Sequence, residues 1–167
     1  MGVVLGWGID LNLIISQINN IDWKNVPVTY NWSTETFGNA EKTAVDLCNL
    51  FSGNMDLAMD ATHSLWCSLC HQHSHISSVA LLAYDFIVKG LDELNDALKI
   101  EILDIILGFA VCTSDIYYKN TKREPLTWEI ELKKKLVGDI QKFKVLSLSE
   151  NQDISFFAGE IVLCINE

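Results

Sequence analysis

Apolar residues recur every three to four positions along most of the chain, which is the period of an α-helix. The stretch 54–90 shows this period most clearly, because an apolar stripe alternates with a polar one in both of its halves. The inward positions of this stretch are Met55, Ala58, Met59, Leu65, Trp66, Leu69, Ile76, Val79, Ala80, Ala83, Phe86 and Ile87. Only residues 71–75 separate the two patterns, so they predict two antiparallel helices that share one core.

Polar residues and glycine mark the ends of these two helices. Asn54 follows Gly53 and can accept hydrogen bonds from the first free backbone N–H groups, so it is the predicted N-cap. Gly90 is the predicted left-handed stop of the second helix. Asp85 and Lys89 are spaced for a salt bridge four residues apart.

The same period predicts most of the remaining chain. Further helices are expected over residues 9–19, 40–51, 92 or 95 to about 113, 127–146 and 154–165. Gly108 is expected to permit a close helix crossing. On the helix over residues 127–146, the spacing favours the surface pairs Glu129–Lys133 and Glu131–Lys135.

Two stretches, 21–38 and 114–125, lack a helical period. The first holds several aromatic residues among Asn, Ser and Thr, and we expect a structured loop that lies across the helices. Its aromatic side chains either cover the N-terminal end of the helical stack or project toward a partner. The second is polar and charged, so we expect an exposed loop. Successive helices without a strand pattern predict a single all-α domain over residues 1–167.

Several short runs resemble the signature of small bacterial HEAT-like helical proteins. The resemblance rests on Leu65–Gln72 (LWCSLCHQ) and on the end of the following apolar helix, Tyr84–Ile87 (YDFI). Upstream, Ile21–Trp23 (IDW) and Ala44–Leu47 (AVDL) fit the same register, so the resemblance covers roughly residues 21–111. It implies a short HEAT-like solenoid of antiparallel helix pairs, although no literal internal repeat is visible.

The chain departs from that signature at four positions. Cys70 stands where the pattern has Tyr, His73 and His75 stand where Gly-Thr and an aromatic residue are usual, and Tyr84 stands near the usual Pro. Several proteins of this type are immunity proteins that neutralise secreted toxins, including toxins of contact-dependent growth inhibition. The resemblance therefore implies an immunity protein, and a generic HEAT-like adaptor is the alternative within the same family.

Negative charge is concentrated in the middle of the chain. The formal net charge is −10, and residues 41–115 carry eleven acidic residues against three lysines, a net of −8. The last 52 residues carry eight acidic and eight basic residues. A negative surface repels nucleic acid and anionic membranes and accelerates the docking of a basic protein, although it also serves as an ordinary solubilising surface.

Charge and resemblance together favour a non-enzymatic inhibitor that covers the active site of a basic toxin domain, expected to be a nuclease. Acidic residues would steer the encounter and pair with lysine and arginine residues of the toxin, while a few aromatic side chains would anchor it. We expect a monomer that forms a heterodimer with the toxin. The predicted contact residues are Tyr30, Trp32, Glu35, Asp60, Asp85, Asp92, Asp96, Glu101, Asp104 and Tyr117.

A cysteine- and histidine-rich run offers a metal-binding alternative. Cys67, Cys70, His71 and either His73 or His75 lie within nine residues and are all good zinc ligands. On a helix, however, Cys67 and Cys70 point in different directions, and the simpler interpretation is a helix corner whose histidines pack and cap. We therefore expect no cofactor and no metal.

No group of residues has the spacing of a catalytic site. Asp56, Asp60 and His63 share one helical face, but a solvated surface accounts for them. The odd number of cysteines, five, favours reduced thiols over a disulfide framework. No basic residue precedes Val3–Leu5 as in a signal peptide, and the longest apolar runs are too interrupted to span a bilayer. These features predict a cytoplasmic protein that is not an enzyme.

Overall fold

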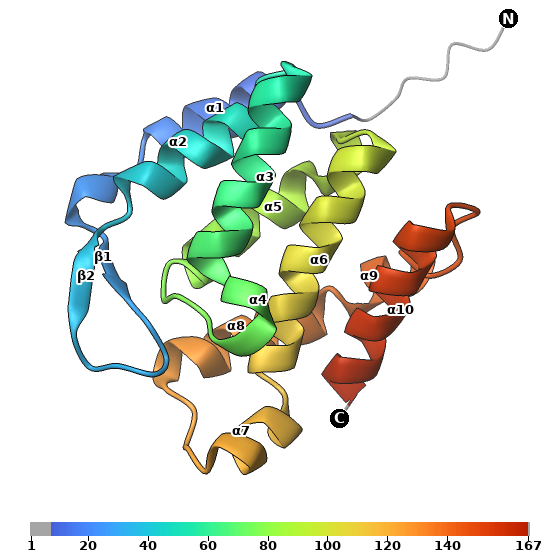
Figure 1. Cartoon of the computed structure of the whole chain (residues 1–167). Helices are drawn as coiled ribbons and strands as arrows, with labels where there is room; N and C mark the ends of the chain where they lie inside the picture. The colour runs from blue at the N-terminus through green and yellow to red at the C-terminus, as the bar shows by residue number, and fades with distance from the viewer. Residues whose placement is uncertain (1–7, 167) are drawn as a thin grey trace, which may run out of the picture.

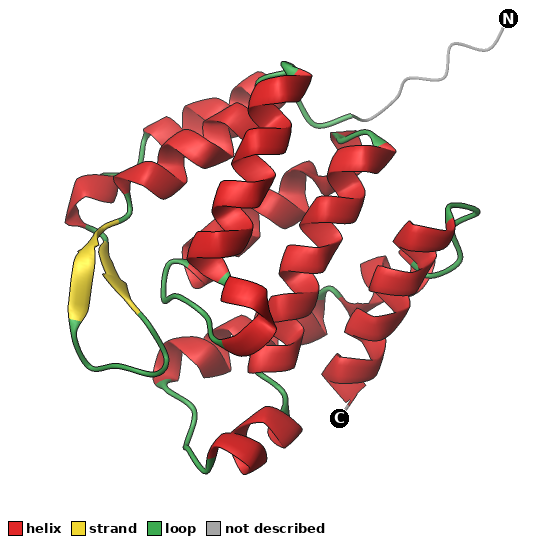
Figure 2. Cartoon of the chain, viewed as in Figure 1, coloured by secondary structure: helices red, strands yellow, loops and turns green. Residues whose placement is uncertain are grey.

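The computed structural model describes residues 8–166, which form a set of packed α-helices and one small β-hairpin (Figures 1 and 2). In chain order the elements are α1 (Leu11–Asn19), the 3-10 turn η1 (Trp23–Asn25), β1 (Pro27–Thr29), β2 (Thr36–Asn39), α2 (Glu41–Leu50), α3 (Met55–Leu69), α4 (His71–Ser74), α5 (Ala80–Gly90), the 3-10 turn η2 (Leu91–Glu93), α6 (Asp96–Cys112), α7 (Asp115–Thr121), α8 (Thr127–Gly138), α9 (Ile140–Leu146) and α10 (Gln152–Asn166). Val3–Leu5, on which the expectation about a signal peptide rests, lie outside the described residues.

The long helices lie in two layers. In Figure 1, α2, α3, α6 and α10 follow one another in the nearer layer, and α1, α5, α8 and α9 follow one another behind them. Buried side chains from Ile14 in α1 to Ile165 in α10 form one continuous hydrophobic core. The prediction of a mostly helical single domain is confirmed.

Asparagine side chains cap two central helices: Asn54 is the N-cap that the sequence predicts, and of the two starts that it left open, residues 92 and 95, the structure has Asn95. Asn54 Oδ1 accepts a hydrogen bond from the Leu57 N–H at 3.1 Å and caps α3, and Asn95 Oδ1 accepts one from the Leu98 N–H at 3.0 Å and caps α6. The chain turns sharply after α3 over residues 70–75, which we call the corner. Beyond it, α5 runs back toward the end where α3 begins (Figure 1).

Two details of the predicted second helix are wrong. The helix begins at Ala80 rather than near Ile76, because the chain first crosses to the hairpin. Gly90 has a φ of −92° and leads directly into η2, so it is not a left-handed stop. Gly90 is needed for a different reason: a Cβ atom there would overlap the ring of Phe51.

The stretch 21–38 contains a β-hairpin, which corrects the expectation of a purely helical chain (Figure 2). Strands β1 and β2 pair antiparallel, with Pro27 opposite Asn39 and Thr29 opposite Thr36, and an irregularity lies between these pairs. Val28, Thr29 and Thr36 favour extended backbone because they are β-branched, and Gly38 supplies a φ of 77°. Short strands of this kind escape a search for helical period.

The C-terminal third contains more breaks than predicted. The stretch 114–125, expected to be a loop, contains α7, which the Ser114 hydroxyl caps by accepting a hydrogen bond from the Tyr117 N–H at 3.2 Å. The single helix expected over residues 127–146 divides into α8 and α9 at Asp139. The carboxylate of Asp139 accepts a hydrogen bond from the Tyr84 hydroxyl at 2.9 Å, which ties this break to α5.

Within residues 8–166, no helix combines the length and the apolar character that crossing a bilayer requires.

Candidate functional site

Aromatic side chains from the hairpin and from the corner after α3 gather on one surface. Tyr30 and Trp32 stack with ring centroids 5.9 Å apart, and Phe37 packs against both at 5.3 and 5.5 Å. His75 contacts Tyr30 and Trp32 edge to face at 5.6 and 6.0 Å. We call Tyr30, Trp32, Phe37 and His75 the aromatic surface. Trp32 is 58% exposed although it is a large apolar side chain, so this surface is available to a partner.

Asn31 holds the hairpin in place, because its backbone and side chain both bind the segment that leads into α5. The Asn31 N–H donates to the Ile76 carbonyl at 3.1 Å, and Asn31 Oδ1 accepts from the Ile76 N–H at 3.2 Å. The adjacent residue Tyr30 forms an isolated bridge with Ser77. Tyr30 and Trp32, on either side of this buried asparagine, are thereby fixed above the corner.

A buried ion pair lies beneath the hairpin. The guanidinium of Arg123 donates two hydrogen bonds to the carboxylate of Glu129, at 2.8 and 2.5 Å, and Glu129 is fully buried. The same carboxylate accepts from Asn31 Nδ2 at 3.2 Å and from the Leu126 N–H at 2.7 Å. The pKa of Arg123 is raised, first by these bonds to Glu129, so the guanidinium keeps its charge. The predicted surface pair between Glu129 and Lys133 is therefore wrong.

Tyr117 joins this network rather than projecting as an exposed anchor. Its hydroxyl donates to the Ser74 carbonyl at 2.9 Å and accepts from Asn31 Nδ2 at 3.2 Å, and its ring is half-buried. The Arg123 guanidinium lies 6.0 Å from the ring centroid of Tyr117 and 5.3 Å from that of Tyr118. Tyr117 thus links Asn31 of the hairpin to Ser74, the residue before His75, and so holds the two segments of the aromatic surface together.

The corner that carries His75 has a strained backbone. Gln72 and His73 have φ angles of 53° and 58°, in the left-handed region that costs about 1–2 kcal/mol for a residue with a side chain. His73 Nε2 lies 2.9 Å from both the backbone oxygen and the carboxylate Oδ1 of Asp104, and the hydrogen bond to that carboxylate raises the pKa of His73. Strain that the surrounding structure holds in place is typical of functional segments.

Glycine at position 108 lets the corner lie against α6. A Cβ atom at Gly108 would come within 2.8 Å of Cys70 Cβ and Sγ and of His73 Cδ2. The predicted close approach at Gly108 is confirmed, and its partner is the corner.

Several of the acidic residues predicted to contact a partner have partners within the chain. Asp85 pairs with Lys135 at 2.6 Å, Asp92 with Lys142 at 2.8 Å and Asp104 with His73 at 2.9 Å. The Asp96 carboxylate accepts from the Asn151 amide at 3.3 Å. Lysines of the C-terminal third therefore neutralise part of the negative charge of the middle third.

Other contacts replace the pairs within one helix that the spacing predicted. Lys89 donates to Gln17 Oε1 at 2.6 Å instead of pairing with Asp85, and Glu131 pairs with Lys134 at 2.9 Å instead of Lys135. Three predicted acidic residues, Glu35, Asp60 and Glu101, are exposed and form no ion pair with any of residues 8–166.

The cysteines and histidines of the metal-binding alternative are engaged separately. Cys67 is exposed with its sulfur 3.8 Å from His63 Nε2, whereas Cys70 is buried and its thiol donates to the Trp66 carbonyl at 3.6 Å. His73 binds Asp104, and His71 stacks on His75 with ring centroids 4.9 Å apart. In the described part of the chain no three His, Cys, Asp or Glu side chains are grouped to hold a metal ion.

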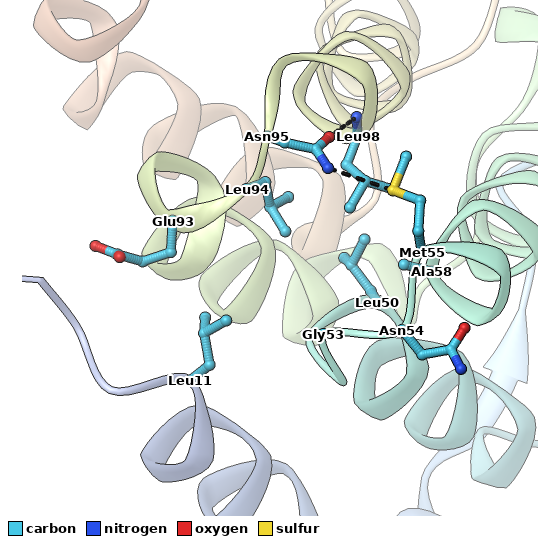
Figure 3. Close-up of a pocket in the computed structure, with 10 residues that line it drawn as sticks. All are labelled: Leu11, Leu50, Gly53, Asn54, Met55, Ala58, Glu93, Leu94, Asn95 and Leu98. Carbon is cyan, nitrogen blue, oxygen red and sulfur yellow. Dashed lines mark hydrogen bonds between the residues drawn. The ribbon is translucent and has the colours of Figure 1, made fainter.

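A small apolar hollow of about 210 Å³ lies among α1, the turn between α2 and α3, and the start of α6 (Figure 3). Its wall contains Leu11, Leu50, Met55, Ala58, Leu94 and Leu98. The polar side chains at its edge are already engaged: Asn54 and Asn95 cap helices, and Glu93 Oε1 accepts from the Ile9 N–H at 3.1 Å. Figure 3 shows Glu93 and Asn54 pointing away from the apolar side chains of the hollow.

Comparison with known proteins gives no match: no protein-family model, no curated protein and no solved structure is significantly similar to the chain. The aromatic surface is thus the candidate site on physical grounds. The sequence indicated Tyr30 and Trp32 as contact residues but not Phe37 and His75, because these residues come together only when the hairpin packs against the segment after α3.

Proposed function

We propose that this chain is an immunity protein that binds a basic toxin domain and blocks its active site. The exposed and rigid aromatic surface carries this proposal. Trp32 is mostly solvent-exposed, yet its contacts with Tyr30, Phe37 and His75 hold it in one orientation. A preorganised aromatic anchor loses little conformational entropy on binding, and tryptophan and tyrosine dominate the energetics of protein interfaces.

The arrangement of the helices supports a HEAT-like solenoid. In such a solenoid, each repeat contributes one helix to each layer and contacts only its neighbours. The layers α2, α3, α6, α10 and α1, α5, α8, α9 provide the two rows of helices that such a stack needs, although α2 and α3, and likewise α8 and α9, follow each other within one layer instead of alternating between layers. The short helices α4 and α7 would then be insertions along the edge of the two layers where α3 and α6 end, on the side of the molecule where the aromatic surface lies.

The charge distribution favours a basic partner. The formal net charge is −10, and the exposed carboxylates of Glu35, Asp60 and Glu101 are free of ion pairs within the described range. A nuclease domain carries cations where it binds nucleic acid, so an acidic inhibitor can cover that site while nucleic acid and anionic membranes are repelled. We place the protein in the cytoplasm, as a monomer that forms a heterodimer with its toxin.

An inhibitor of this kind needs tight binding, because a toxin that escapes kills the cell that carries both proteins. Nanomolar affinity corresponds to about −12 kcal/mol. Exposed ion pairs contribute little at physiological salt, whereas buried aromatic anchors contribute about 2 kcal/mol or more each. We therefore assign the affinity to the aromatic surface and the association rate to the acidic residues.

The test is binding to a basic toxin domain, to be sought at the C-terminus of a large secreted protein encoded next to this chain. Trp32→Ala should raise the Kd about 30-fold in calorimetric titration, because the anchor is removed. The matched control is Phe156→Ala on α10, since Phe156 is 59% exposed and lies outside the aromatic surface. Equal losses for the two variants, or no inhibition of the toxin by the intact protein, would contradict the proposal.

Two alternatives make different predictions. A zinc-binding protein built on Cys67, Cys70, His71 and His73 would contain stoichiometric zinc after purification, which elemental analysis measures. A HEAT-like adaptor would bind a partner without abolishing a toxic activity, so survival of cells that express the toxin separates it from an immunity protein.

A further inference from the structure

A second hollow borders the aromatic surface where the hairpin tip faces the link between α7 and α8. It has a volume of about 230 Å³. Its lining residues are Asn31, Trp32, Ser33, Thr34, Arg123, Glu124 and Leu126. We propose that this hollow holds an arginine side chain of the protein partner, with the guanidinium between the Trp32 indole and the Glu124 carboxylate. The inference rests on the proposed function, in which the partner is a basic protein.

The side chains around the hollow match the parts of an arginine. Trp32 is the best type of aromatic ring for a cation–π contact, and Tyr30 covers one face of its indole while more than half of the residue stays exposed. Leu126 is 43% exposed and offers an apolar surface for the aliphatic stem. The hydroxyl groups of Ser33 and Thr34 add polar atoms on the hairpin side.

Of the charged groups that line the hollow, only the Glu124 carboxylate lacks a counter-charge among the described residues, which favours a cation over an anion. The only base in its lining, Arg123, is bound through both terminal nitrogens to Glu129, so the charge of this pair cancels. Glu124 is exposed and forms no ion pair with another described residue. Glu35, on the same hairpin, is also exposed and free of ion pairs in that range, so it adds negative potential.

The two walls of the hollow are linked by buried hydrogen bonds. Asn31 Nδ2 donates to Glu129 at 3.2 Å, and Glu129 in turn binds Arg123 and the Leu126 N–H. The hairpin wall and the α7–α8 wall therefore keep their spacing before a partner arrives. A guanidinium is rigid and planar, so a preformed slot suits it better than it suits the flexible ammonium of lysine.

Nuclear magnetic resonance on the full chain tests this assignment. The probes are N-acetyl-arginine amide, its neutral isostere N-acetyl-citrulline amide, and inorganic phosphate, and the readout is the indole N–H resonance of Trp32, assigned with Trp32→Phe. The arginine probe should shift this resonance in a saturable way, with an affinity about tenfold higher than that of the citrulline probe. Trp23 is an internal reference, because its indole is buried and donates to the Ile18 carbonyl at 2.7 Å.

Two variants test whether Glu124 supplies the carboxylate that binds the guanidinium. Glu124→Gln should weaken arginine binding several-fold, whereas Glu150→Gln, which removes an exposed charge near α10, should leave it unchanged. Equal shifts by arginine and citrulline, a preference for phosphate, or equal effects of the two variants would overturn the assignment. If the toxin binds while the probes leave Trp32 unshifted, this inference fails and the proposed function stands. If the arginine probe binds while no basic toxin domain does, the proposed function fails instead.

Discussion

At the scale of single residues, Glu129 shows what local spacing conceals. It lies four residues before Lys133 on a helix, which is the arrangement of a solvated surface pair. Its true partner, Arg123, precedes the helix, and burial makes the pair depend on hydrogen bonds from Asn31 and Leu126. Helical period locates apolar faces well, but it cannot show that a charged residue is buried with a partner from another segment.

Gly108 provides a prediction at this scale. Gly108→Ala should lower the free energy of unfolding by about 1–3 kcal/mol, because the added methyl group collides with Cys70 and His73 across a packed contact. Urea denaturation followed by circular dichroism measures the change.

Gly159→Ala is the matched control, because it is also a helical glycine but no atom lies within 4 Å of its ideal Cβ. Alanine is favoured over glycine inside a helix, so this variant should gain about 0.5–1 kcal/mol. A loss at Gly159 as large as that at Gly108 would show that the corner is not the cause.

At the scale of elements, the hairpin and the corner determine the site together. Two short strands and a strained turn place Trp32, Phe37 and His75 side by side, although 43 positions separate the first from the last. The alternation of Tyr30 and Trp32 around Asn31 is compatible with extended backbone, but three- and four-residue strands give too little pattern for a firm prediction. The strands β1 and β2 pair residues that are close in sequence, such as Thr29 and Thr36, but the contacts that hold the hairpin on the molecule, such as those of Asn31 with Ile76, are distant in sequence.

The contact between the corner and α6 predicts a pH dependence of stability. The raised pKa of His73 means that the folded state favours the protonated imidazole beside Asp104. This stabilisation is complete below the ordinary histidine pKa of about 6.5 and is lost as the pH rises through the raised value in the folded protein. Two thiols lie at the same contact, Cys70 within the corner and Cys112, which donates to the His73 carbonyl. Burial raises the pKa of both thiols, that of Cys112 to about 12, so both remain neutral.

Asp104→Asn should therefore cost about 1 kcal/mol or less near pH 5.5, and the difference from the wild type should shrink by pH 8.5. Denaturant unfolding at both values of pH measures this, and Asp96→Asn on the same helix is the control. Burial lowers the pKa of His75, so its titration changes stability with pH in the direction opposite to that of His73. This contribution is the same in the wild type, Asp104→Asn and Asp96→Asn, so it cancels when their unfolding free energies are subtracted. A pH-independent difference would refute the role given to His73.

At the scale of the whole molecule, folding redistributes the charge that the sequence concentrates in its middle third. Lysines of α8 and α9 lie against acidic residues of α5 and η2, as in the Lys135–Asp85 and Lys142–Asp92 pairs. The net charge of −10 persists, but several carboxylates of the middle third are paired, and exposed carboxylates without an ion pair among the described residues include Glu35 on the hairpin, Asp60 on α3, Glu101 on α6 and Glu124 between α7 and α8. Long-range attraction of a basic partner thus follows from composition, whereas its docking face depends on the fold.

Two charge variants test where a basic partner docks. Lys142→Gln releases Asp92 from its ion pair, whereas Lys144→Gln removes an exposed lysine that pairs with no acidic residue in the described range. Each variant removes one positive charge, so the formal net charge changes equally in the two. If the partner approaches over η2 and α6, Lys142→Gln should raise the association rate at low salt about two- to threefold more than Lys144→Gln does. Stopped-flow mixing measures both rates. Equal rates would place the docking face elsewhere.

The sequence by itself determined a mostly helical domain, the cap at Asn54, the close approach at Gly108 and the acidic character of the molecule. These features depend on interactions within a few residues or on composition alone, so they can be derived from the order of residues. Only the tertiary structure decided the hairpin, the burial of Glu129 and the neutralisation of Asp85 and Asp92. The position of the hairpin, the burial of Glu129 and these ion pairs depend on contacts with residues far away in the chain, such as those of Asn31 with Ile76 and Glu129, and no local pattern specifies which distant group will supply the partner.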